Sequence, residues 1–213
     1  MLQLELTSVV EHSFREHSQA VDRYLDKHRD TYLDMAHKIQ PDHDDWCAVW
    51  SRVAFAILSA NARFEDSVVA LDYCSHHQGH VDPGTLATYR MTPAKAAYVN
   101  ALPLGIKACG YTRQPGESYH EQRMRLTGIK GLALTKASFL VALLDPLNAD
   151  VACIDTHMQR VYLGQRFHTL RLQEYQSIES KVREVGERHH VSTFVAQWAI
   201  WDHARGKVTS HDI

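Results

Sequence analysis

The sequence predicts an all-α protein. Nearly every long segment places its apolar residues at the helical period of 3.6, and no segment shows the sustained alternation typical of a half-buried strand. Proline, glycine and aspartate stand between these apolar segments, where helices begin and end. With 213 residues, 45% of them hydrophobic, the chain is long enough for one compact core or for two small helical lobes.

The first half of the chain is expected to form several helices. Pro41 ends the first apolar run, and Thr92 followed by Pro93 is the pattern of an N-cap and a first helical residue. Residues 46–60 are apolar on nearly every side, which is typical of a helix buried on most faces. The expected helices cover residues 13–39 (as one helix or two), 46–60, 64–74 and 93–109.

The second half of the chain is also expected to form helices, two of them joined by one tight turn. Two glycines, Gly128 and Gly131, lie in the segment 127–133 between two apolar helical runs, and the expected pattern is helix, hairpin, helix. Asp155 precedes another helical run and is well placed to cap it. The expected helices cover residues 117–126, 134–144, a stretch from about 156, 172–188 and 192–205.

Composition narrows the class of protein. The net charge of −2 gives no basic field that would draw the whole chain onto nucleic acid, so only local phosphate contacts can bind DNA. No apolar stretch approaches a membrane span, and the first residues lack the pattern of a signal peptide, so we expect no membrane partner and a cytoplasmic protein. Four scattered cysteines predict free, mostly buried thiols, and neither they nor the histidine pairs predict a metal site.

Two segments carry possible chemistry. In TGIKGLALTKASF, the glycines allow a sharp turn, and the helix that follows exposes amide groups that suit a phosphate, while Ile129 and Leu132 would anchor the turn to the core. In VACIDTHMQRVY, an apolar run delivers Asp155 to a helix start, where its carboxylate can act as a base or face a developing cation. Taken singly, the first pattern also fits an ordinary helix–helix turn and the second an ordinary N-cap.

Together the two segments resemble the helix-hairpin-helix DNA glycosylase superfamily, which includes the endonuclease III and 8-oxoguanine glycosylase branches. The family's hairpin reads approximately LPGxGxKxA and is followed by VDxHxxR, and the counterparts here are IKGLALTKA and IDTHMQR. LSANARF is similar to the family's LSxN segment, and QWAIWDHARGK to its closing helix, so the resemblance covers about residues 55–207. It implies one unit of two helical lobes around a base-binding cleft: residues 45–150, with the hairpin motif at 118–144, and residues 1–44 with 151–213.

The resemblance also implies site residues. Asp155 would be the catalytic carboxylate, and Asn61 would supply the amide that fills the gap left by a flipped base. Trp198 and Trp201, three apart on one helix, are typical of a buried core, but part of this helix could also stack on an extruded base. The expected DNA-binding residues are Asn61, Lys130, Gly131, Ala133, Thr135 and Lys136, and the expected pocket residues are His157, Arg160, Gln197, Trp201 and Arg205.

The chain departs from the family's pattern at two hairpin positions. Bifunctional members attack the sugar with a lysine, where this chain has Thr135, and the next residue, Lys136, is rotated by about 100° on a helix. Ala133 replaces the second hairpin glycine. Schiff-base lyase chemistry is therefore not expected, and the four-cysteine cluster of the endonuclease III branch is absent from the sequence.

Three functions follow from the resemblance. The segments GLALTKASF and CIDTHMQR, with the missing lysine, look most like a phage branch of thymine pyrophosphorylases or amino-acid:DNA transferases. That branch implies transfer of an amino acid such as glycine to 5-phosphomethyluracil in double-stranded DNA, in a phage-infected or other bacterial cytoplasm. The alternatives are a monofunctional glycosylase for a damaged or modified base and an inactive DNA-binding scaffold. No cofactor is expected, although the family's hairpin can hold a monovalent or magnesium ion.

Overall fold

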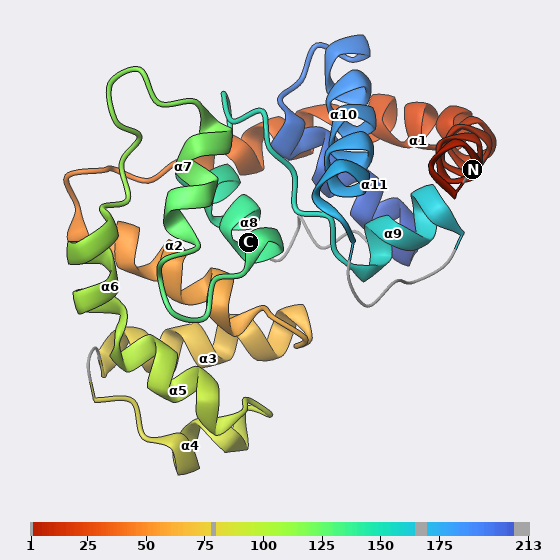
Figure 1. Ribbon diagram of the computed structural model, residues 1–213. Coiled ribbons are helices and arrows are strands. Elements are labelled where there is room, and N and C mark those ends of the chain that lie inside the picture. Colours follow the sequence, from red (N-terminus) through yellow and green to blue (C-terminus); the bar gives the residue numbers. More distant parts are fainter. Residues whose placement is uncertain (1, 78–79, 165–169, 207–213) are drawn as a thin grey trace. The chain divides into compact units, whose positions relative to one another are not determined.

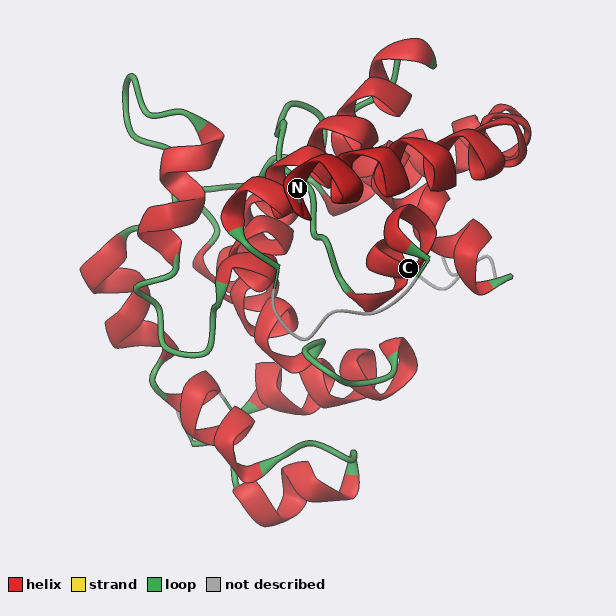
Figure 2. Ribbon diagram, turned by 45° about the vertical axis from the view of Figure 1, so that its right-hand side comes forward, coloured by secondary structure: helices red, strands yellow, loops and turns green. Residues whose placement is uncertain are grey.

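The computed structural model describes residues 2–77, 80–164 and 170–206, with side chains from residue 19 onward. These residues form helices and loops and contain no strand (Figure 1 and Figure 2), which confirms the predicted fold class. The helices are α1 (Leu2–Ile39), α2 (Trp46–Leu58), α3 (Phe64–His76), α4 (Pro83–Thr88), α5 (Pro93–Asn100), α6 (Leu102–Cys109), α7 (Tyr119–Leu126), α8 (Leu134–Leu144), α9 (Thr156–Leu163), α10 (Leu172–Arg188) and α11 (Thr193–Arg205).

The chain divides into two compact units, one of them Pro41–Leu144. In this unit α2 packs against α3, α5, α6 and α8, and α8 also packs against α7. Val49, Trp50 and Val53 of α2 are fully buried, as the sequence predicts for a helix with apolar residues on most sides. The hairpin between α7 and α8 is therefore attached to α2 through α8.

The other unit consists of Met1–Gln40 with Asp145–Ile213. Its helix α11 packs against α1, α9 and α10. A buried hydrogen bond of 2.9 Å from Tyr32 Oη to Asp202 Oδ2 joins α1 to α11. Burial, with the neighbouring Tyr24 and Asp202, raises the pKa of Tyr32 far above its ordinary value, so the hydroxyl remains a donor.

Several predicted helix starts are confirmed. The side chains of Asp45, Ser118 and Ser192 accept amide hydrogen bonds at the starts of α2, α7 and α11, and Ser118 forms a capping box with Glu121. Thr92 occupies the N-cap position of α5, but its side chain makes no cap hydrogen bond. The first helix is a single one and begins at Leu2 instead of near residue 13.

The prediction of one helix over residues 93–109 was wrong. The structure has two helices here, α5 and α6, which meet at Ala101. Pro103 explains the break, because it lacks an amide hydrogen and its ring clashes with the carbonyl group four residues earlier. At the second position of α6 neither property disturbs a helical hydrogen bond.

The cysteines and the helix lengths bear on two further predictions. All four cysteines are free, but only Cys74 and Cys153 are buried, whereas Cys109 is half-buried and Cys47 is exposed. The expectation of mostly buried thiols was therefore correct for half of them. No helix of the described residues is both long and apolar enough to span a membrane.

Candidate active site

Asp155 caps the N-terminus of α9. Its Oδ1 atom accepts hydrogen bonds of 2.9 Å from the amide groups of His157 and Met158, as the sequence predicted for an N-cap. Its Oδ2 atom accepts a third hydrogen bond, of 3.0 Å, from Trp201 Nε1. An ionised carboxylate has about four lone-pair sites. Three donors therefore leave one lone pair, on Oδ2, for a reacting group.

Buried side chains hold the extended segment 151–154 that leads to Asp155. The amide groups of residues 152, 153 and 154 donate in turn to Glu179 Oε1 (2.9 Å), Gln197 Oε1 (2.6 Å) and Tyr175 Oη (3.1 Å). The Tyr175 hydroxyl donates in turn to the carbonyl oxygen of residue 152, at 2.7 Å. These bonds replace the neighbouring strand that such a segment would otherwise need. They fix the point at which Asp155 enters α9.

Trp201 is the centre of a second set of contacts in this unit. The guanidinium carbon of Arg205 lies 4.0 Å from the centre of the Trp201 ring. His157 meets the same ring edge-on at 6.2 Å between centroids. The Arg205 Nη1 atom is buried and has no hydrogen-bond acceptor within the described residues. The structure thus brings Asp155, His157, Trp201 and Arg205 together.

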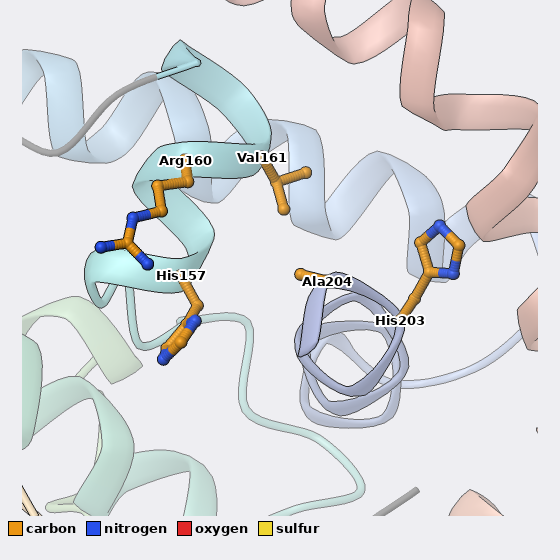
Figure 3. A pocket seen from close by; sticks show the side chains of 5 residues that line it. All are labelled: His157, Arg160, Val161, His203 and Ala204. Carbon is orange, nitrogen blue, oxygen red and sulfur yellow. The ribbon is translucent and has the colours of Figure 1, made fainter. Parts of the chain in front are cut away.

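A pocket of about 320 Å³ opens between α9 and α11. His157, Arg160 and Val161 line it from α9, and His203 and Ala204 line it from α11 (Figure 3). His157 and Arg160 project from one side of the pocket and His203 from the other. Two predicted pocket residues, His157 and Arg160, thus line a pocket, and His203 is a lining residue that the sequence did not indicate.

Gln197 lies elsewhere than the sequence suggested. It is buried, with 6% of its surface exposed, and its side-chain oxygen binds the backbone amide of Cys153. It therefore supports the segment before Asp155 and does not line the pocket between α9 and α11.

The hairpin forms around Gly131, whose φ of +99° is a conformation that favours glycine. A Cβ atom at this position would lie 2.8 Å from Tyr98 Cδ2, so glycine is required by space as well as by conformation. Ile129 and Leu132 are 1% and 3% exposed and anchor the turn in the core, as predicted. The hairpin is thus a rigid part of its unit.

The outer side of the hairpin presents donors. Lys130 and Ala133 are exposed, and Thr135 is partly exposed. Ala133 has no side-chain acceptor for the amide groups of Leu134 and Thr135, whereas those of Lys136 and Ala137 donate to its carbonyl oxygen. The positions of these residues suit an anion at the helix start.

Two carbonyl groups of the same turn have acceptor capacity for the ion that the resemblance implies. The carbonyl oxygens of Leu126 and Ile129 each accept one amide within the turn and each keep a second lone pair. Leu126 and Ile129 would hold a monovalent or magnesium ion, whose charge would attract a phosphate.

Asn61 and Lys136 are associated with the end of α2. Asn61 is exposed, with a φ of +50°, in the loop that follows this helix. Lys136 Nζ donates to Ser59 Oγ at 3.1 Å, and Lys95 Nζ donates to the carbonyl oxygen of Leu58 at 2.6 Å. Burial, with the charge of Lys136, lowers the pKa of Lys95 to about 8. Two amines therefore stabilise the negative end of α2 beside Asn61.

Three supporting residues escaped the sequence analysis. Tyr175 and Glu179 lie four positions apart on the apolar face of α10, where a buried carboxylate is unusual and could have indicated a structural role. For Lys95 the sequence contains no comparable signal, because a single lysine on a helix is ordinarily exposed. Its burial depends on contacts that only the fold reveals.

No protein-family model matches the chain, and no curated protein sequence matches it. Solved structures do align with the chain in three dimensions. The 8-oxoguanine DNA glycosylase of Thermotoga maritima aligns with a TM-score of 0.71 at 17% identity, over 92% of this chain and 99% of its own. The 8-oxoguanine DNA glycosylase of Methanocaldococcus jannaschii gives 0.71 at 18% identity, over 92% and 98%.

A third alignment is with the Methanocaldococcus jannaschii 8-oxoguanine glycosylase/lyase in complex with a 15mer DNA containing 8-oxoguanine. It has a TM-score of 0.63 at 19% identity and covers 96% of this chain and 99% of that one. The chain therefore has the helix-hairpin-helix DNA glycosylase fold.

Proposed function

We propose that this chain is a base-flipping enzyme of double-stranded DNA and that Asp155 is its catalytic carboxylate. The observation that carries the proposal is the Asp155 carboxylate, which three hydrogen bonds hold in place with one lone pair left on Oδ2. The fold supports it, because the solved structures that share this fold are DNA glycosylases and one of them is bound to DNA. The exposed Lys130 and the amide groups at the start of α8 would bind a DNA phosphate.

The first candidate reaction is the transfer of an amino acid, such as glycine, to 5-phosphomethyluracil. The amine nitrogen forms a bond to the 5-methylene carbon, the bond from that carbon to the phosphate oxygen breaks, and inorganic phosphate leaves with the electron pair. Asp155 takes the proton that the amine loses. The likeness of residues 131–139 and 153–160 to the phage branch supports this reaction.

The leaving phosphate needs cationic or hydrogen-bonding groups, because negative charge develops on its oxygen. Arg205 offers a buried donor without an acceptor in the described part of the chain, and His157 lies beside the same tryptophan. Thr135, in the position of the family's lysine, offers no amine for a covalent intermediate. The site is therefore suited to direct displacement by an external nucleophile.

The second candidate reaction is monofunctional base excision, and the glycosylase fold favours it. Water would attack the sugar carbon as the bond to the base breaks, and the base would leave with the electron pair and be protonated. Asp155 would face the positive charge of the sugar and accept the water's proton. The third candidate, an inactive scaffold, does not require the reactive lone pair of Asp155.

One experiment tests the proposal. Duplex DNA carrying 5-phosphomethyluracil is incubated with the protein and mixed amino acids, and its nucleosides are analysed by mass spectrometry. An amino-acid adduct on an intact nucleoside supports transfer. Free base and an abasic site in this duplex, or in one with 8-oxoguanine, support excision and contradict transfer. If neither product forms while the DNA is bound, the chain is a scaffold.

Asp155→Asn is the matched variant, since an amide can still cap α9. We expect the product to fall by at least about a hundredfold while affinity for DNA is kept. Asp45→Asn, at the N-cap of α2, is the control for the cost of changing a cap. Equal losses of activity in both variants would contradict the catalytic role of Asp155.

A further inference from the structure

The surroundings of Trp201 leave little of its indole for a ligand. Its N–H group is bonded to Asp155 Oδ2 at 3.0 Å, and the Arg205 guanidinium covers one ring face at 4.0 Å. Trp198 and His157 meet the ring edge-on, at 5.2 and 6.2 Å between centroids. The sequence suggested that this tryptophan might stack on an extruded base, but one face and the only polar atom are already occupied.

The bond from Trp201 differs in kind from the other two bonds of Asp155. The donors to Oδ1 are amide groups of α9 itself, the helix that Asp155 caps. Trp201 belongs to α11, 46 residues further along the chain. Bonds to both oxygens from two different helices restrict the rotation of the carboxyl group about its last bond. The indole therefore determines which lone pair of Oδ2 stays available.

We infer that Trp201 is a positioning residue that orients the Oδ2 atom of Asp155, and not a stacking platform for a flipped base. The inference rests on the proposed catalytic role of Asp155 and adds a specific partner to it. Arg205 contributes by packing on the ring, which keeps the indole in the plane that the bond requires.

Trp201→Phe separates the two roles, because phenylalanine keeps an aromatic face but has no N–H donor. Orientation predicts that kcat falls by about 10- to 100-fold with little change in KM for DNA. Stacking predicts that Trp201→Phe is tolerated and that Trp201→Leu raises KM. That result would overturn the inference.

Trp198→Phe is the control for a lost indole on the same helix. Trp198 is 4% exposed and touches the Trp201 ring, so the variant creates a comparable packing defect without removing the bond to Asp155. We expect it to lower stability and to leave kcat nearly unchanged. A matching fall of kcat in both variants would show that packing, and not the hydrogen bond, is responsible.

A second readout needs no activity. The chain has four tryptophans, and Trp201→Phe identifies the indole N–H resonance of Trp201 in a nitrogen–proton correlation spectrum. Because this N–H group donates to Asp155 Oδ2, Asp155→Asn should shift the resonance, whereas Asp45→Asn should leave it in place. A resonance that Asp155→Asn does not move overturns the inference even in an active enzyme. If the wild type forms no product, the proposed function fails, while this spectrum still decides on the Trp201–Asp155 contact.

Discussion

Gly131→Ala tests whether the hairpin owes its geometry to glycine. An L residue at a φ of +99° is strained by about 1–2 kcal/mol. The new Cβ atom would lie 2.8, 3.0 and 3.1 Å from the Cδ2, Cγ and Cβ atoms of Tyr98, and such overpacking costs about 1–3 kcal/mol. The free energy of unfolding should therefore fall by about 2–5 kcal/mol.

Urea denaturation measures this loss, and Gly116→Ala is the matched control. Gly116 has a φ of +80°, but nothing lies within 4 Å of a Cβ atom there, so only the strain of about 1–2 kcal/mol applies. In the double variant Gly131→Ala/Tyr98→Ala the two changes should offset each other in part, because the ring that obstructs the Cβ is gone. Equal losses for Gly131→Ala and Gly116→Ala would refute the steric reasoning.

Three further predictions concern charged residues. Burial lowers the pKa of Lys95 to about 8, whereas its pKa in the unfolded chain is about 10.4. Between these two pH values the unfolded chain binds more protons than the folded protein. The free energy of unfolding of the wild type should therefore rise with pH relative to that of Lys95→Met, by up to about 3 kcal/mol. Parallel pH curves from urea denaturation would contradict this. Lys130→Ala should reduce the slope of the logarithm of DNA affinity against the logarithm of salt concentration by about 1, whereas the control Lys107→Ala on α6 should leave it unchanged. Burial alone would raise the pKa of Asp22, but hydrogen bonds, led by that from His189, lower it. Asp22→Asn should therefore cost about 0.5–1 kcal/mol at pH 7, a difference that disappears as the pH falls below about 4.

Helices and their starts were largely predictable because their causes are local. Apolar spacing and capping side chains act within one or two turns, and Ser118 and Asp155 both cap the helices that the sequence indicated. The break at Ala101 was also local, and Pro103 marks it, but the continuous apolar pattern on both sides concealed it. In each case the deciding residue was visible in the sequence.

The environment of the candidate site was less predictable, since it depends on residues that are distant in sequence. The position of Asp155 was indicated, but its bond to Trp201 joins residues 46 positions apart. Gln197 was predicted as a pocket residue and Glu179 was not singled out, yet the fold shows that both are buried and bind the segment 151–154. Periodicity places a side chain on a face of a helix, but it does not reveal which backbone group that face will meet.

The side chains that hold residues 152–154 lie 21, 27 and 44 positions away from the amide groups they bind, all of them later in the chain. During synthesis the ribosome therefore releases Asp155 well before the helices that hold it in place. The candidate catalytic carboxylate can reach its final position only after α10 and α11 have emerged and packed. A nascent chain that stops before α11 would contain the complete hairpin and Asp155, yet would lack the bonds from Gln197 and Trp201 that hold this carboxylate in place.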